Sequence, residues 1–318
     1  MSQTSSGSVW FGVALPQLRA PFGEMLERAL VAERTGFDSI WVMDHLVPEH
    51  PLGYEGKLNS FEGWTFATAL AARTTRIRIA HAVLCDGFRH PALLARMAAT
   101  LDVISGGRFE LGIGWGSHVT ADELRRYGFG TPSNRDRAER LRETLDIFRL
   151  MLACKPFDYD GRYFQLQDAL GAPEPVQAGI PVHIGGAGRQ LTMPLVRDHA
   201  DWWSCPPNVT ADALAELREL ARPARVAAMR PVALVPPGGS RAEVMERAGV
   251  RFCGTSGSSR IRSLVLGDAT ELAERLAAEV REGVRGFVLS FDDGASTASL
   301  ERFMADVAPA VRTAATRA

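Results

Sequence analysis

The stretch from residue 76 to residue 116 limits the possible folds of this chain more than any other. An apolar segment over 76–84 precedes a polar turn, an amphipathic segment over 91–104 and a second apolar segment over 109–113. This order is typical of a strand–helix–strand unit whose two strands are parallel. Polar residues and glycines gather directly after both strands, where parallel α/β proteins place their ligand sites.

The same alternation extends over the whole chain. Apolar segments predict eight strands, at 10–15, 39–43, 76–84, 109–113, 181–184, 201–204, 225–235 and 286–290. Segments with helical periodicity follow them, at 22–34, 61–72, 91–104, 135–153, 189–199, 212–221, 241–248, 269–282 and 300–313. Eight such units in 318 residues, without a boundary in composition, favour one closed (β/α)8 barrel over an open sheet. We therefore expect residues 1–318 to form a single TIM-like domain.

Two long polar connections lie within this pattern. Residues 46–59 contain several prolines and glycines, and residues 114–134 form a second polar excursion after the fourth strand. Connections of this length in a compact domain are often functional lids, so both are expected to be loops beside the site. Residues 157–166 predict a small hairpin, and no element is predicted for the Gly/Ser-rich residues 252–262.

Bulk composition excludes several classes of function. The net charge of −1 gives no electrostatic basis for binding nucleic acid. No apolar run approaches the ~20 residues that span a bilayer, and residues 1–12 lack the basic start of a signal peptide. Cys85, Cys154, Cys205 and Cys253 are scattered, which is typical of a reducing compartment. We expect a cytoplasmic protein that binds a small molecule.

Residues that directly follow a strand are expected at the mouth of such a barrel. They are Gln17, Asp44, His45, Cys85, Asp86, residues 115–118, residues 185–188, Ser204, Cys205, Asp292 and Asp293. Gly185, Gly186 and Gly188 stand between a strand and a helix, where backbone N–H groups and the helix dipole can bind phosphate. The alternative is a tight turn that needs only the conformational freedom of glycine. Arg189 beside them either adds a positive charge or is simply exposed.

The glycine-rich end of the fourth strand does not fit the dinucleotide-binding fingerprint. The sixth position counted from Gly112 is Ser117, and no helical pattern begins there. Close approach of a flat ligand to the backbone at Gly112 and Gly114 is the better explanation, with a ligand-free β-bulge as the alternative.

Histidines are the other candidates for chemistry. Asp44 and His45 place a carboxylate beside an imidazole that can move protons near neutral pH, although a capping Asp and a half-buried His explain the pair equally well. His118 is either a general acid or a solvated loop residue. His81 and His183 lie inside strands, and each by itself is better explained as a core residue. No HxH or HExxH spacing occurs, so no metal site is expected.

Five segments carry a family resemblance: GFDSIWVMDHL at 36–46, TTRIRIAHAVL at 74–84, FRHPALLARMAATLDVISGGRFELGIGWG at 88–116, Tyr-Gly at 127–128 and PVHIGGAGRQ at 181–190. Together they resemble the bacterial luciferase-like monooxygenase superfamily, and most of all its branch that uses the deazaflavin coenzyme F420. The match covers residues 10–205 well and residues 260–290 more loosely.

The resemblance implies a TIM-like barrel that holds F420, or alternatively FMN, at its carboxyl-terminal mouth. It implies a bulge in the third strand behind the cofactor ring, often with a non-proline cis peptide, near Ala82-Val83. It also implies that the glycines after the fifth strand bind the cofactor phosphate. The residues expected around the cofactor are Asp44, His45, His81, Ala82, Val83, Gly112, Gly114, Trp115, Gly185, Gly186, Gly188 and Arg189.

The chain departs from the family pattern at positions that concern the substrate. The sugar-phosphate dehydrogenase relatives carry Glu after the strand-four glycines, where this chain has Ser117 and His118, and Trp where it has Glu49. A sugar phosphate is therefore not expected, and the acid is not identified. His81 replaces a small or hydroxyl residue and could project to the cofactor or substrate. The expected substrate contacts, between the loops 46–59 and 115–134, are Gln17, Glu49, Trp115 and Ser117.

Three functions remain open at this point. The first is an F420-dependent oxidoreductase that moves a hydride between the deazaflavin C5 and a small organic substrate, with His45 or His118 moving the proton. The second is an FMN-dependent monooxygenase that uses reduced flavin and O2. The third is a barrel that binds flavin without turnover. Helices of such barrels often pair, so a homodimer is possible.

Overall fold

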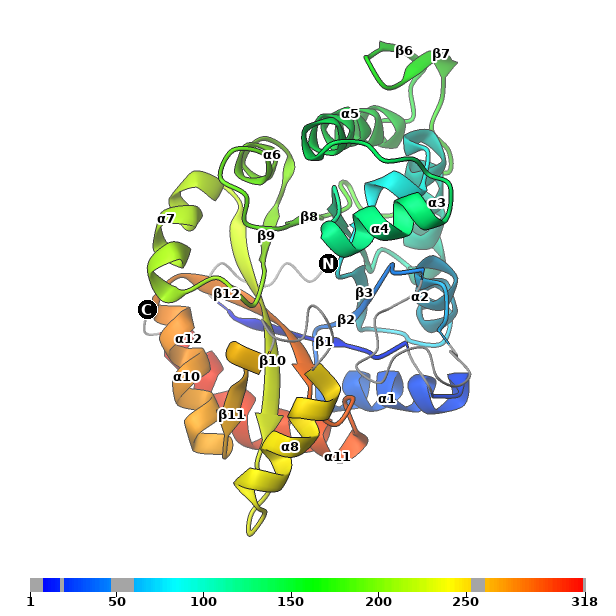
Figure 1. The fold of residues 1–318 in the computed structure, drawn as a ribbon. Helices are drawn as coiled ribbons and strands as arrows, with labels where there is room; N and C mark the ends of the chain where they lie inside the picture. Colours follow the sequence, from blue (N-terminus) through cyan, green and yellow to red (C-terminus); the bar gives the residue numbers. More distant parts are fainter. Residues whose placement is uncertain (1–7, 18–19, 47–59, 253–260, 317–318) are drawn as a thin grey trace.

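Eight parallel strands close into a ring in the computed structural model, which describes residues 8–17, 20–46, 60–252 and 261–316 (Figure 1). The strands are β1 (Trp10–Ala14), β2 (Ser39–Val42), β3 (Arg78–His81), β5 (Phe109–Gly114), β8 (Val182–Gly185), β9 (Trp202–Cys205), β10 (Arg225–Leu234) and β12 (Val284–Phe291). Each pairs with the next, and the register of Trp10 with Gly286 joins β12 to β1. The predicted (β/α)8 barrel is confirmed.

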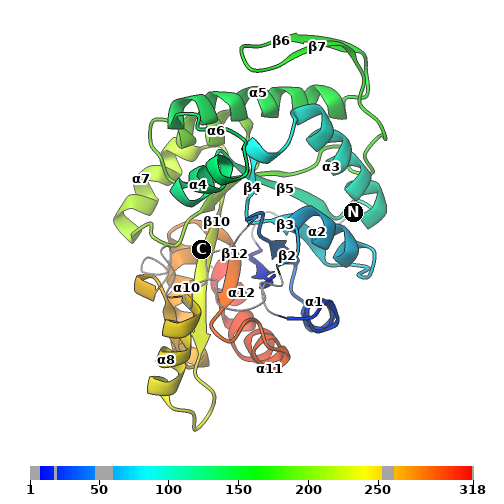
Figure 2. The same ribbon diagram turned by 45° about the vertical axis from the view of Figure 1, so that its right-hand side comes forward.

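Helices cover the outside of the ring (Figures 1 and 2). They are α1 (Phe22–Thr35), α2 (Gly63–Ala71), α3 (Pro91–Ser105), α5 (Asn134–Leu152), α6 (Thr192–His199), α7 (Ala211–Ala221), α8 (Arg241–Phe252), α10 (Ala269–Arg281), α11 (Thr297–Arg302) and α12 (Ala308–Ala315). The last two are joined by the π-helical η2 (Phe303–Val307), where the sequence predicts one helix over 300–313. None of the helices described is long and apolar enough to cross a membrane.

The predicted hairpin is present as β6 (Phe157–Asp160) and β7 (Gln165–Ala169), which pair antiparallel and project beyond α5 in both views (Figures 1 and 2). A short strand that the sequence did not predict, β11 (Val265–Gly267), pairs with the far end of β10 and lies outside the ring.

The third strand is interrupted where a single strand over 76–84 was predicted. After β3 the chain breaks at Ala82-Val83, whose peptide bond is cis, and resumes as β4 (Leu84–Cys85) and the turn η1 (Asp86–Phe88). β4 then pairs with β5 through Leu84 and Ile113. The cis bond lies at the position that the family resemblance implied.

The prediction of a loop over 114–134 is largely wrong, because residues His118–Arg126 form helix α4. Ser117 caps this helix: its hydroxyl accepts the N–H of Thr120, and the Thr120 hydroxyl accepts the N–H of Ser117. Leu124 fixes the helix to the barrel because its side chain is buried. The segment is only nine residues long and mostly polar, so few apolar residues mark it as a helix in the sequence.

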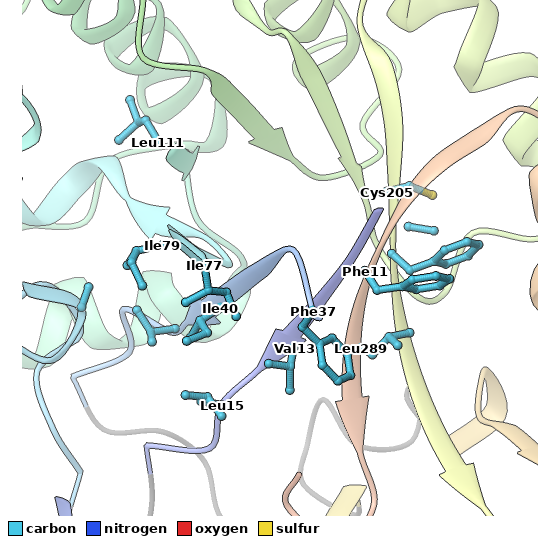
Figure 3. Packing of buried hydrophobic residues seen from close by; sticks show 14 of the residues in the cluster. Phe11, Val13, Leu15, Phe37, Ile40, Ile77, Ile79, Leu111, Cys205 and Leu289 are labelled. Atoms are coloured by element: carbon cyan, nitrogen blue, oxygen red, sulfur yellow. The ribbon is translucent and has the colours of Figure 1, made fainter. Parts of the chain in front are cut away.

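The main hydrophobic core lies between the ring and its helices (Figure 3). Phe11, Ile40, Ile79 and Leu111 come from four adjoining strands and are fully buried. Because side chains of a strand alternate, the residues between them point into the barrel.

The interior of the barrel is filled by aromatic rings. Trp10 stacks on Trp41 at a centroid distance of 5.9 Å, and Trp202 stacks on His183 at 5.7 Å. A Cβ at Gly12 would lie 2.3 Å from the indole nitrogen of Trp41, so this glycine makes room for the ring. The interior is thus a packed core that closes the barrel below its mouth. Trp202 and its neighbour Trp203 are both buried.

Candidate active site

A cavity of about 460 Å³ lies at the carboxyl ends of the strands from β2 to β10. Ten residues that the sequence predicted for the site line it: Asp44, His45, Ala82, Val83, Gly114, Trp115, Ser117, Gly185, Gly186 and Gly188. Cys85 and Ser204, which were expected at the mouth as strand-end residues, also line it. So do residues that were not predicted, among them Thr120, Thr192, Pro206 and Met229. The mouth of the barrel therefore gathers most of the predicted site in one place.

Val83 forms one wall of the cavity between two glycines. A Cβ built on Gly114 would lie 3.2 Å from Val83 Cγ2, and one built on Gly185 would lie 3.1 Å from the same atom. Neither glycine has the positive φ that demands glycine for conformational reasons. Both are needed because the Val83 side chain occupies the space of their side chains. The result is a smooth wall, suited to a flat ring.

Gly112 does not line the cavity, in contrast to the prediction. A Cβ at this position would lie 1.8 Å from the carbonyl oxygen of His81. The absence of a side chain allows β5 to approach the end of β3 closely, so packing within the barrel explains this glycine.

Asp44 lines the cavity, but its oxygens are held by protein groups. The guanidinium of Arg89 donates to both carboxylate oxygens, at 2.7 and 2.8 Å, and the Cys85 N–H donates to Oδ2 at 2.9 Å. Burial raises the pKa of Asp44, although Arg89 opposes this effect. Arg89 also pairs with Glu62 at 2.8 Å. Asp44 therefore ties β4 to the end of β2 and braces the wall that contains Val83.

His45 pairs with a carboxylate from α4. Its Nδ1 lies 2.9 Å from Oε2 of Glu123. The Glu123 side chain is 5% exposed and the His45 side chain 35% exposed. A hydrogen bond at Nδ1 fixes the orientation and tautomer of the ring, which leaves Nε2 available for proton exchange. The sequence prediction missed Glu123 because it treated α4 as a loop; the capping pair Ser117 and Thr120 was the available signal.

Trp115 is fixed in the cavity from two sides. Its indole N–H donates to Thr192 Oγ1 at 3.1 Å, and the Arg137 guanidinium lies over its ring at 5.1 Å. Arg137 also donates to the Ser117 carbonyl at 3.2 Å. Ser117, predicted as a substrate contact, lines the cavity and at the same time caps α4.

The turn after β8 has the features of an anion site. Gly186 has φ +118°, which favours glycine, and its carbonyl accepts the Trp203 indole N–H at 2.6 Å. Within the described residues, the N–H groups of Ala187, Gly188 and Arg189 donate no hydrogen bond. They precede the start of α6, whose first turn has no side-chain cap. The N–H groups of Thr192 and Met193 at the helix start are bonded to the Gly188 carbonyl, so the free N–H groups are those of the turn itself, and successive free backbone N–H groups attract an anion such as phosphate.

Three other predicted residues, Arg189, His118 and Gln17, do not line the cavity. Arg189 points away and pairs with Glu216 at 2.5 Å with 60% of its side chain exposed. His118 is the exposed first residue of α4. Gln17 is buried, and its amide nitrogen donates to the carbonyls of Met43 and Phe61 while its oxygen accepts the Met43 N–H. Glu49 lies outside the described residues, as do residues 47–59 of its loop.

His81 is a core residue and does not project into the cavity. Its ring stacks on Trp64 of α2 at 5.1 Å and meets the edge of Phe109 at 5.9 Å. It shares the outward direction of Ile79, two residues earlier in the strand. Burial lowers the pKa of His81 to about 3, with a smaller effect of the Arg89 charge, so the ring is neutral at physiological pH. The described part of the chain holds no group of three or more His, Cys, Asp or Glu residues placed to bind a metal.

Residues 4–253 match the family model described as luciferase-like monooxygenase. An F420-dependent glucose-6-phosphate dehydrogenase from Microbacterium testaceum is 35% identical over 171 residues, which are 53% of this chain and 48% of that protein. An uncharacterised protein from Mycobacterium tuberculosis H37Rv is 33% identical over 56% of this chain and 66% of its own length. The chain thus spans about half the length of the curated dehydrogenases that it matches.

Solved structures share the fold over almost the whole chain. An F420-dependent secondary alcohol dehydrogenase in complex with an F420–acetone adduct has a TM-score of 0.79 and 20% identity, covering 96% of this chain and 99% of that one. A monooxygenase from Streptomyces bottropensis has a TM-score of 0.78 and 18% identity, covering 94% and 99%. At these identities the similarity is one of fold.

Proposed function

The chain belongs to the luciferase-like monooxygenase family, and from this premise we propose that it is an F420-dependent oxidoreductase. The proposed reaction is transfer of a hydride between C5 of the deazaflavin ring and a small organic substrate. Relatives named as F420-dependent glucose-6-phosphate dehydrogenases match 53% and 52% of the chain.

One observation carries the proposal: a flat wall and an anion-binding turn adjoin in the same cavity. Val83, set between Gly114 and Gly185, offers a surface without projecting side chains. The turn over 186–189 begins directly after Gly185 and offers free N–H groups. A ligand that combines a flat ring with a phosphate on a short chain fits both, and F420 and FMN each have this form.

The residues of the chain have distinct roles in this proposal. The buried Asp44–Arg89 pair holds the wall in place. The Glu123 carboxylate orients His45, whose Nε2 then gives or takes the proton that accompanies hydride transfer. Trp115 narrows the cavity and helps to exclude water. Bound F420 would supply the hydride chemistry at C5 of its ring.

FMN-dependent monooxygenation is the second candidate. The Val83 wall and the turn suit the flavin ring and phosphate of FMN as well as those of F420, and a monooxygenase shares the fold at a TM-score of 0.78. A cavity that excludes water would protect an oxygen adduct of reduced flavin. A barrel that binds the cofactor without turnover is the third possibility.

Paired titrations test the proposal. The purified protein is titrated with F420 and with FMN, and quenching of each cofactor's fluorescence is followed. We expect F420 to bind at least about tenfold more tightly, a difference of about 1.4 kcal/mol. Tighter binding of FMN would favour the monooxygenase, to be followed by oxygen consumption with reduced FMN. Binding of neither would refute the assignment of the anion site.

A turnover assay then separates an enzyme from a carrier. Reduced F420 is mixed with the protein and a panel of aldehydes, ketones and imines, and the return of the oxidised cofactor's absorbance is recorded. We expect catalysed reoxidation with at least one carbonyl compound. A protein that binds F420 tightly yet accelerates no reoxidation, in either direction, would support the carrier instead.

A further inference from the structure

The hydroxyl of Ser204 is a polar group without a partner at the wall of the cavity. Ser204 lines the cavity from the end of β9, and only 1% of the residue is exposed to solvent. Its Oγ has no hydrogen-bond partner among the described residues. Its neighbours in the strand are already engaged, since Trp203 donates to the Gly186 carbonyl and Cys205 to that of Pro206.

An isolated hydroxyl is costly at this place. Residues around Ser204 at the mouth are apolar: Pro206, Pro207 and Met229 line the same side of the cavity. A buried hydroxyl that makes no hydrogen bond destabilises a protein, and most buried polar groups in native structures are satisfied. Alanine would fill this position without that cost. The hydroxyl is therefore best explained by a partner that arrives with a ligand.

The position of Ser204 favours the substrate over the cofactor ring. Ser204 pairs with Gly185 in the β8–β9 register, so it lies one strand, about 4.8 Å, beyond the wall formed by Val83 and the two glycines. A ring stacked on Val83 would leave the side of the cavity near Ser204 and Met229 for a second ligand.

The charged side chains around the cavity limit the chemical class of the substrate. No Arg or Lys side chain of the described residues lines the cavity. Asp44 is held by Arg89, and His45 by Glu123. Among the residues that the structure describes, a substrate with a carboxylate or phosphate would find no free cation on this side, whereas a neutral molecule would meet an apolar surface and one hydroxyl.

We propose that Ser204 recognises the oxygen of a small, uncharged and mainly apolar alcohol or carbonyl substrate. This inference rests on the proposed function, because the substrate stacks on the cofactor that covers the Val83 wall. The serine hydroxyl donates to a carbonyl oxygen, or exchanges donor and acceptor roles with an alcohol.

The test uses two probes of the same shape, cyclohexanone and methylenecyclohexane, of which only the first has an oxygen. Each is titrated into the wild-type protein and into Ser204→Ala, both loaded with F420, and the change in cofactor fluorescence gives the affinity. We expect the wild type to prefer the ketone and Ser204→Ala to bind it about three- to tenfold more weakly. Affinity for the hydrocarbon and for F420 itself should change less than twofold.

A matched control is available inside the same barrel. Ser39 is also a buried serine, but its hydroxyl accepts the Trp41 indole N–H at 2.7 Å. Ser39→Ala should lower the melting temperature and leave the preference for the ketone intact. Ser204→Ala should leave the melting temperature of the ligand-free protein unchanged or raise it. Ser204→Cys, which keeps the size of the side chain but is a weaker donor, should also lose the preference.

Four results would overturn the assignment. Equal affinities of the wild type for ketone and hydrocarbon, or a ketone affinity unaffected by Ser204→Ala, would exclude recognition of the oxygen by Ser204. A fall of threefold or more in F420 affinity would place the contact on the cofactor ring. Failure of the wild type to bind F420 or FMN would instead contradict the proposed function, and the substrate assignment with it.

Discussion

The Val83 wall makes a specific prediction about Gly185. In Gly185→Ala the new Cβ would lie 3.1 Å from Val83 Cγ2 and 3.2 Å from Cγ1. Carbon atoms in comfortable contact are about 3.5–4.0 Å apart, so Val83 must move by roughly half an ångström. In the ligand-free protein the cavity gives Val83 room to move. With the cofactor bound, the ring occupies that room.

Gly185→Ala should therefore weaken cofactor binding more than it destabilises the folded protein. Overpacking of a filled site costs about 1–3 kcal/mol, which corresponds to a roughly 5- to 150-fold loss of F420 affinity. Fluorescence titration measures this loss, and chemical denaturation of the ligand-free variant should show a change well below 1 kcal/mol. Gly179→Ala is the matched control, because nothing lies within 4 Å of its Cβ.

A second substitution tests whether contact between the new Cβ and Val83 causes the loss of affinity. Val83→Ala removes both methyl groups that the new Cβ would meet, so Gly185→Ala with Val83→Ala should bind F420 more tightly than Gly185→Ala alone. We expect a coupling energy of at least about 1 kcal/mol in the double-mutant cycle. Wild-type affinity of Gly185→Ala, or strictly additive effects of the two substitutions, would refute the argument that the wall supports the ring.

Three further predictions concern ionisable groups. Asp44→Asn leaves Arg89 buried without its main partner and should lower the free energy of unfolding, measured by chemical denaturation, by about 3 kcal/mol. A much smaller decrease would contradict a buried ion pair. Glu123→Gln should slow F420 reoxidation about tenfold in stopped-flow absorbance at unchanged F420 affinity, because His45 loses its anionic partner; an unchanged rate would exclude this role. His81 has a pKa of about 3 when folded and about 6.5 when unfolded, so acidification protonates the unfolded state first. Below pH 6.5, the free energy of unfolding of the wild type should therefore decrease with falling pH more steeply than that of His81→Phe, by up to ~1.4 kcal/mol per pH unit. Denaturant titrations that give parallel pH profiles for the two proteins would contradict this prediction.

The ring of strands could be predicted from the sequence because each strand is apolar and ends in a turn signal. The alternation of side-chain direction along a strand explains where the two strand histidines point. His81 follows Ile77 and Ile79 at intervals of two and faces the helices, whereas His183 lies between Val182 and Ile184 and faces the interior. The family resemblance pointed His81 toward the cofactor, and the alternation of the strand argued against it.

The parts that the sequence could not supply depend on tertiary contacts. Helix α4 is short and mostly polar, so few apolar residues mark it, and the pairing of Glu123 with His45 bridges 78 positions of the chain. The requirement for Gly112 comes from a carbonyl on another strand. Ser204 was recognised as a residue at a strand end, but the lack of a partner for its hydroxyl is visible only once its neighbours are placed.

The aromatic filling of the barrel interior has a consequence for kinetics. Because Trp10, Trp41 and Trp202 close the interior, the cavity is a dead end, and both ligands must pass through the same opening. Of two ligands in such a cavity, the one that lies deeper must enter first and leave last. Two-substrate kinetics at such a site should show a compulsory order of binding, in which the second ligand traps the first and slows its dissociation.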